Sequence, residues 1–200
     1  ENKGLLRELQ HRIKNTLSII TSLAGIESGA DVDPSVKTAL ENIKGRMRAL
    51  SNLYSLLYSS GDVKDVSLDG YIRSVADTVV SAFSAPASGM NMGFDLEAMT
   101  INVKKATSFG LILNEFLTNA FKHAFSGGGH IIIRVKLERS GGSIVLSVSN
   151  SGKGLSENFD PEKTEGFGLK LASMLARQHG GNVEFARGEL TVFTARMPES

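Results

Sequence analysis

The sequence contains no cysteine and no long hydrophobic run, and its charges nearly balance. The absence of cysteine excludes disulfides and thiolate metal sites. No segment approaches the roughly 18 consecutive apolar residues that a membrane-spanning helix needs, so we expect this chain to make no membrane contact. A formal net charge of +1 gives no electrostatic reason to expect binding to nucleic acid or anionic lipid.

The length of 200 residues and the hydrophobic content of 41% predict a folded protein with one ordinary domain and a smaller one. No signal peptide is visible, and the lack of cysteine is compatible with a reducing compartment, so we expect a cytoplasmic location. Because the sequence starts directly in a helical pattern, we expect it to be the cytoplasmic part of a longer protein.

Apolar residues recur at spacings of three and four in two stretches of the first 60 residues. The repeats are Leu6, Leu9, Ile13, Leu17, Ile20 and Leu23, then Val36, Leu40, Ile43, Met47, Leu50, Tyr54 and Leu57. Their average of 3.5 residues is typical of a coiled-coil seam. Gly29 can end the first helix, and Asp33 with Pro34 can begin the second. Residues 1–60 are therefore predicted to form a helical hairpin that dimerises into a four-helix bundle.

Residues 61–66 are interpreted as a linker, and residues 67–200 as a second domain that mixes helices and strands. Helices are predicted at 69–83, 103–125 and 166–180, and strands at 90–98, 130–138, 143–150, 182–186 and 190–197. The segment "RSGG" between two of these strands is typical of a hairpin turn. This order predicts an α/β sandwich, in which helices cover one face of a mixed, mostly antiparallel sheet.

His11, in "ELQHRIKNTL", is the first candidate for chemistry. At helical pitch it lies nearly opposite the apolar seam, so its side chain is expected to face solvent. On periodicity alone, an ordinary exposed histidine is the favoured interpretation. A metal site is disfavoured, because no second histidine or carboxylate pair has ligand spacing nearby.

A second candidate is "NEFLTNAFKH", in the predicted helix 103–125. Polar side chains within about 80° of one another form a lane along this helix. The lane comprises Ser108, Glu115, Asn119, Lys122 and His123. Glu115 and Asn119 can offer oxygen ligands to a divalent cation, while Lys122 and His123 could face phosphates. A solvated helix face is the alternative, weakened by flanking phenylalanines.

Two glycine pairs follow, Gly152 with Gly154 and Gly166 with Gly168. Gly168 opens a helix, whose N-terminal amides suit a phosphate. The sequence has neither a Walker loop nor a GxGxxG fingerprint, and a GxG alone is weak evidence. The polar residues between the pairs are typical of a lid.

Four motifs in order, "HRIKNTL", "NEFLTNAFKHAF", "NSGKGL" and "GFGLKLASMLARQHGG", resemble sensor histidine kinases of the HRxxN type, related to the HWE kinases. The resemblance covers nearly the whole chain. It implies an α+β protein, in which a two-helix hairpin that forms a dimeric four-helix bundle precedes a Bergerat-type α/β sandwich that binds ATP. It also implies a homodimer and a partner, the receiver domain of a response regulator.

Carried over residue by residue, the resemblance makes His11 the phosphoacceptor and Asn119 the residue that holds Mg²⁺. Glu115, a second candidate metal ligand and catalytic group, would line the metal and phosphate region. The other implied ATP-binding residues are Lys122, His123, Asn150, Gly152, Gly154, Gly166, Gly168, Leu169 and Thr191. We expect Glu8, one turn before His11, to orient or deprotonate the imidazole.

The chain departs from the family pattern at three points. Asn150 stands where these kinases usually have an aspartate that accepts from the adenine amino group, and a neutral acceptor forms a weaker bond. Arg12 follows His11 where many kinases have an acidic residue, and the chain has no tryptophan for a WxE motif. Two alternatives therefore stay open, a degenerate kinase acting as a scaffold and a serine kinase or anti-sigma-type regulator of the same fold.

Overall fold

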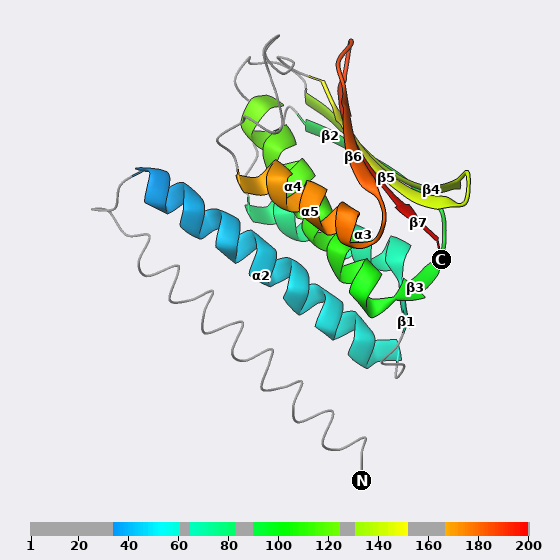
Figure 1. The fold of residues 1–200 in the computed structure, drawn as a ribbon. Helices are drawn as coiled ribbons and strands as arrows, with labels where there is room; N and C mark the ends of the chain where they lie inside the picture. The colour runs from blue at the N-terminus through cyan, green and yellow to red at the C-terminus, as the bar shows by residue number, and fades with distance from the viewer. Residues whose placement is uncertain (1–33, 61–64, 83–89, 125–130, 152–166, 200) are drawn as a thin grey trace.

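A computed structural model describes residues 34–60, 65–82, 90–124, 131–151 and 167–199. The helices are α2 (Pro34–Ser60), α3 (Leu68–Ala82), α4 (Val103–Ala124) and α5 (Phe167–Gln178). The strands are β1 (Asp65–Ser67), β2 (Met90–Leu96), β3 (Thr100–Asn102), β4 (Ile131–Ser140), β5 (Ser143–Asn150), β6 (Asn182–Ala186) and β7 (Thr191–Pro198). Figure 1 shows α3, α4 and α5 on one face of the sheet, with α2 on the outer side of these helices.

The main sheet has the strand order β2-β4-β5-β7-β6. Strand β2 runs parallel to β4, and the other neighbours are antiparallel. The expected α+β class, with helices on one face of a mixed, mostly antiparallel sheet, is confirmed. A second sheet of β1 and β3 was not predicted, since three-residue strands leave almost no periodic signal. Through β1, the last two residues of the expected linker, Asp65 and Val66, pair with β3, and Val66 is buried.

The core lies between the sheet and the helices. Strand β7 alternates buried and half-buried residues, as a strand with one covered face must. Helix α4 packs against β5 and the other helices, and its residues Ala106, Phe109, Leu113, Leu117 and Ala120, spaced by three and four, are all buried. The rings of Phe116 and Phe193 pack with centroids 5.5 Å apart, which joins α4 to β7.

Glycines end two of these elements, β4 and α5, as predicted. Gly141 and Gly142 have φ angles of 59° and 72°, which a two-residue hairpin turn of the primed type requires. Gly180 has a φ of 72° and donates its N–H to Arg177, while Gly181 donates to Ala176. Left-handed glycine with two such bonds is the usual stop for a helix, and it ends α5.

Polar contacts hold the start of α4 against the ends of α5 and β7. The Oγ atom of Ser108 lies 2.9 Å from Nε2 of His179, and Lys105 donates from Nζ to the carbonyls of Pro198 and Glu199. Burial, and then the charge of Lys105, lower the pKa of His179 below its usual value. Ser108, which the sequence placed in the same polar lane as Glu115, is thus part of this structural contact.

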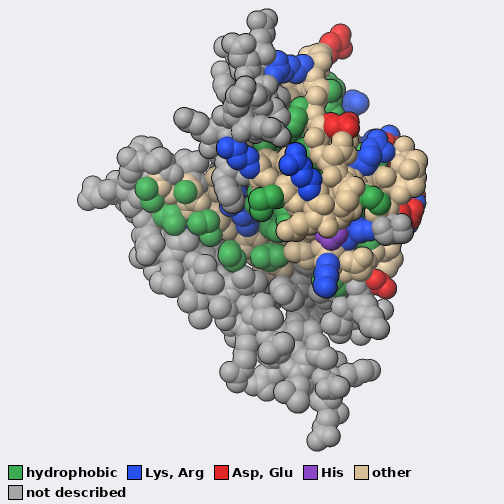
Figure 2. Space-filling view, in the orientation of Figure 1, with side chains coloured by type: hydrophobic (Ala, Val, Ile, Leu, Met, Phe, Trp, Pro, Cys, Tyr) green, Lys and Arg blue, Asp and Glu red, His purple; other side chains and the backbone are tan. Residues whose placement is uncertain are grey.

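Helix α2 confirms the predicted second helix and begins at Pro34, as expected. Two residues of its apolar seam, Val36 and Ile43, are 47% and 38% exposed, and Figure 2 shows hydrophobic side chains along α2 on the side that faces the viewer. The opposite side, which carries Gly45 and Ala49, faces α4 and α3. The predicted first helix lies outside the described residues.

Tyr71 connects three helices. Its ring is fully buried on α3, and its hydroxyl donates to the carbonyl of Ala49 on α2 at 3.0 Å. Burial raises the pKa of Tyr71 far above its usual value, so the hydroxyl keeps its proton. A Cβ atom at Gly110 on α4 would overlap the same phenol ring. Gly110 is therefore the gap in α4 into which Tyr71 fits.

We expect Gly110→Ala to lower the free energy of unfolding by roughly 2–5 kcal/mol, measured by chemical denaturation. Alanine normally stabilises a helix interior by about 1 kcal/mol relative to glycine, so the expected sign is opposite to the helix propensity. The reason is the overlap with Tyr71, which would have to leave its pocket and its bond to Ala49. Tyr71→Leu should relieve the clash, so the double variant should cost much less than the two single costs added together. Additive costs would contradict this packing.

Candidate functional site

The structure describes some of the residues that were predicted to form a site, and others lie outside the described ranges. Those outside the described residues are Glu8, His11, Gly152, Gly154 and Gly166. The backbones of Lys122 and His123 belong to α4, but their side chains also lie outside the described part. The structure therefore places Glu115, Asn119, Asn150, Gly168, Leu169 and Thr191.

Asn150 and Thr191 are direct neighbours across two strands. Asn150 ends β5, Thr191 begins β7, and their Cα atoms are register partners. They continue the buried alternation of Val148 and Phe193, so both side chains belong to the helix-covered face of the sheet. Both are buried, with exposures of 2% and 6%. Two polar residues 41 positions apart thus form one buried polar spot at an edge of the core.

Asn150 carries an unused hydrogen-bond acceptor. Its Nδ2 atom donates to the Ser151 carbonyl over a long 3.4 Å, whereas Oδ1 is buried and has no hydrogen-bond partner among the described residues. A buried, unpaired carbonyl costs about 1–3 kcal/mol, so native proteins seldom retain one without a reason. An acceptor of this kind fits a ligand that brings an N–H donor, such as an exocyclic amine.

Glu115 and Asn119 lie one turn apart on α4. Glu115 is 3% exposed and Asn119 is half-buried. The solvated-face interpretation is therefore wrong for Glu115. A Cβ atom at Gly168 would overlap Oε2 of Glu115, so the beginning of α5 lies directly against this carboxylate. Leu169, 5% exposed, anchors the same turn of α5 in the core. The second glycine motif and the α4 motif thus meet in space.

The Glu115 carboxylate is held by a residue that the sequence did not point to. Arg46 of α2 donates from Nε to Oε1 at 2.8 Å and from Nη2 to Oε2 at 3.2 Å. Asn114 adds a bond from Nδ2 to Oε1 at 3.2 Å. Arg46 is 69 residues from Glu115 in the chain, and no local pattern distinguishes it from other helix arginines. The geometry is the bidentate pairing that a guanidinium and a carboxylate favour.

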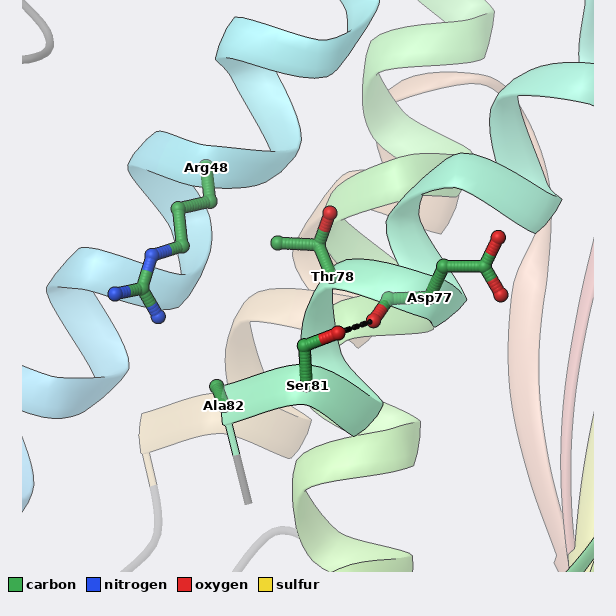
Figure 3. A pocket seen from close by; sticks show the side chains of 5 residues that line it. All are labelled: Arg48, Asp77, Thr78, Ser81 and Ala82. Carbon is green, nitrogen blue, oxygen red and sulfur yellow. Dashed lines mark hydrogen bonds between the residues drawn. The ribbon is translucent and has the colours of Figure 1, made fainter. Parts of the chain in front are cut away.

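A depression between α2 and α3 does not share these features. It is lined by Arg48, Asp77, Thr78, Ser81 and Ala82, and Figure 3 shows the Asp77 carboxylate directed away from Arg48. The hydroxyls of Thr78 and Ser81 donate to backbone carbonyls of their own helix, at 2.9 and 2.8 Å. None of the predicted site residues lines it, so it is not a candidate catalytic site.

Two kinds of feature are absent from the part of the chain that the structure describes. Within the described ranges, no three His, Asp or Glu side chains gather closely enough to hold a metal ion by themselves. In the same part of the chain, no helix is both long and apolar enough to span a membrane.

Two family models match the chain. The model described as "Histidine kinase" matches residues 8–83, and the model described as "Histidine kinase-, DNA gyrase B-, and HSP90-like ATPase" matches residues 104–200. The first match includes His11 and α2. The second includes Glu115, Asn119, Asn150, Gly168 and Thr191, which are the residues described above.

Known proteins agree with these models. The chain is 27% identical over 188 residues to Blue-light-activated histidine kinase 2 of Erythrobacter litoralis, covering 92% of this chain and 53% of that protein. It is 26% identical over 175 residues to the Sensor histidine kinase PdtaS of Mycobacterium tuberculosis, covering 85% and 34%. The chain thus spans about half or less of the length of these relatives.

Among solved structures, the histidine kinase domain from the Erythrobacter litoralis EL346 blue-light activated histidine kinase superposes with a TM-score of 0.73 at 25% identity. The alignment covers 97% of this chain and 90% of that domain. The catalytic domain of the histidine kinase ThkA, at 19% identity and a TM-score of 0.54, covers 68% of this chain and shares its fold.

Proposed function

Since the chain belongs to the histidine kinase family, we propose that it transfers the γ-phosphoryl group of ATP to its own His11 and then to an aspartate of a response-regulator receiver domain. In the first step, a lone pair on an imidazole nitrogen of His11 forms a bond to the γ-phosphorus. The bond from phosphorus to the bridging oxygen breaks, and ADP leaves with that electron pair. Glu8, one turn away, would accept the imidazole proton. In the second step, the aspartate oxygen displaces the imidazole.

The observation that carries the ATP assignment is the unpaired Oδ1 of Asn150. It is buried beside Thr191 and lies within the region matched by the ATPase model. Adenine presents an amino group, which donates the hydrogen bond that this atom lacks. Because Asn150 is neutral, we expect a weaker bond than an aspartate would form, but one of the same polarity.

The phosphate end of the nucleotide would lie toward α4 and the first turn of α5. Asn119 and Glu115 offer oxygen atoms suited to Mg²⁺, which usually binds through one or two protein groups together with phosphate oxygens. Bound Mg²⁺ would neutralise phosphate charge, which is most of what phosphoryl transfer requires besides positioning. The amides at Gly168 and Leu169 open α5, where the helix dipole favours an anion. Lys122 and His123 would add positive charge.

The proposed assembly is a homodimer. The seam residues Val36 and Ile43 are exposed on α2, while Leu40, Met47 and Leu50 are only half-buried. An apolar stripe of this kind on a helix needs a partner, and a second copy of the hairpin supplies it as a four-helix bundle.

Incubation with γ-labelled ATP and Mg²⁺ tests the proposed reaction. We expect time-dependent labelling of the protein that is labile in acid, stable in base and abolished by EDTA. Acid-stable label would instead indicate a serine kinase of the same fold. Nucleotide binding without any labelling would indicate a degenerate kinase, and would contradict the proposal.

The proposed contact between Asn150 and the adenine amino group can be tested separately. We expect Asn150→Leu, which removes the acceptor at nearly constant volume, to weaken ATP binding by about 2–10-fold, the value of one neutral hydrogen bond. ITP, whose base has an oxygen in place of the amino group, should bind weakly to the unchanged protein and lose little more on substitution. Titration of both nucleotides by calorimetry measures this. Equal losses for ATP and ITP would show that Asn150 does not read the amino group.

A further inference from the structure

The contact between α2 and α4 is polar at its centre. Arg46 and Glu115 form a bidentate ion pair there, in which the carboxylate side chain is 4% and the arginine side chain 18% exposed. Beside it, the Asn114 carboxamide packs against Gly45, where an added Cβ would lie 2.9 Å from Oδ1. That Oδ1 atom is buried and has no hydrogen-bond partner within the described part of the chain.

These groups give the interface specificity but little net stability. Removing two charges from water offsets most of what a buried ion pair gains, and the buried, unpaired Asn114 oxygen is destabilising. The direct hydrogen bond from Tyr71 to Ala49 adds only a modest gain. The contact therefore fixes where α2 lies on α4. Among the α2 side chains that the structure describes, Ala49 is the only apolar one that is buried, so opening the contact would expose little apolar surface besides Ala49 and the ring of Tyr71.

The ion pair also competes with the role proposed for Glu115. Both carboxylate oxygens already accept hydrogen bonds from Arg46, and Oε1 accepts another from Asn114. A carboxylate so engaged is a poor ligand for a cation, because each oxygen would have to give up a charge-assisted bond. The guanidinium would also repel a divalent cation at the same place.

We propose that Arg46 is the latch of an autoinhibited state, in which α2 is docked on α4 and Glu115 is withheld from the nucleotide site. Activation breaks the pair between Arg46 and Glu115, and α2 separates from the catalytic domain. This inference rests on the role proposed above for Glu115. At helical pitch Gly45 and Ala49 lie on the side of α2 away from the seam, and Arg46 lies about 70° from the centre of the seam, so the latch and the proposed dimer interface use different sides of the helix.

Arg48 provides a matched control. It lies on the same helix two residues later, is also partly buried, and forms no ion pair among the described residues. Arg46→Met and Arg48→Met remove the same charge and nearly the same volume. A difference between them therefore reports the pair with Glu115 rather than the loss of an arginine from α2.

The decisive measurement is the distance between α2 and the sheet, because it needs no catalysis. The chain has no cysteine, so Lys37→Cys on α2 and Glu184→Cys on β6, both exposed, would carry the only spin labels. We expect Arg46→Met to broaden and lengthen the distance distribution without nucleotide, and Arg48→Met to leave it unchanged. Mg²⁺ with a non-hydrolysable ATP analogue should shift the unchanged protein in the same direction.

Autophosphorylation of the same proteins gives the second readout. We expect Arg46→Met to raise the initial labelling rate at least threefold and Arg48→Met to leave it unchanged. An unchanged distance distribution in Arg46→Met would overturn the latch, whatever the rate. A slower rate at unchanged distance would instead make Arg46 a positioning residue for Glu115. If no variant is labelled, the proposed kinase function fails, while the distances still decide whether the latch exists.

Discussion

Labelling from γ-labelled ATP is expected to fall to background in His11→Ala, a loss of more than a hundredfold. The reason is chemical, since the alanine side chain has no nucleophilic atom that could form a phosphoramidate. The chain has only three other histidines, His123, His130 and His179. Of these, His179 lies against Ser108, with a ring nitrogen 2.9 Å from the hydroxyl. Its ring is thus committed to a structural contact.

His179→Gln is the matched control for this experiment. Glutamine can keep a hydrogen bond to Ser108, so the variant should fold and should be labelled like the unchanged protein. ATP binding by His11→Ala should also be unchanged, because the site described around Asn150 and Thr191 belongs to another part of the chain. Label that persists in His11→Ala would refute His11 as the phosphoacceptor.

Fixing α2 on α4 by a disulfide is expected to abolish autophosphorylation, and reduction is expected to restore it. A Cβ atom at position 45 would lie 3.5 Å from Cγ of Asn114, and a cysteine sulfur at 114 would occupy nearly the place of that Cγ atom. This spacing suits a disulfide between Gly45→Cys and Asn114→Cys. The bond would keep Arg46 beside Glu115, so the carboxylate could not reach the nucleotide.

The single variants Gly45→Cys and Asn114→Cys control for the substitutions themselves. Each should be labelled equally with and without reductant, since neither can form an internal bridge in a chain that otherwise lacks cysteine. The bridged protein should still bind ATP through the adenine contact, which separates locking from unfolding. A bridged protein that is labelled as fast as its reduced form would show that α2 need not leave α4.

Periodicity was sufficient to predict most of the fold. Strand β7 buries one face and therefore alternates, and α3 buries Leu68, Tyr71, Ile72, Val75, Ala76 and Val79 at spacings of three and one, so both periods can be read in the sequence. The parallel pairing of β2 with β4 could not be predicted, because it joins residues 90–96 to residues 131–137 and no local signal encodes partner or direction. The role of Gly110 likewise could not be predicted, because it depends on the ring of Tyr71, which packs against it from another helix.

The sequence was sufficient to predict which residues belong to the candidate site, but not which residues contact one another there. The motifs named Asn150 and Thr191, and the structure made them cross-strand neighbours and left one oxygen unpaired. Glu115 was predicted at a metal site, but its partner Arg46 lies on a helix predicted to belong to the other domain. Contacts of this kind depend on how two helices pack against each other, and the residue pattern of one helix does not reveal that packing.

The position of β7 inside the sheet has a consequence for how this chain folds during synthesis. It is the last described strand, and it lies between β5 and β6, with Thr191 opposite Asn150. During synthesis, β4 and β5 can pair early as a hairpin, but the sheet stays divided until the ribosome has released β7. The polar spot at Asn150 is completed at the same moment. A nascent or truncated chain can therefore hold most of its secondary structure while it is still unable to capture a nucleotide.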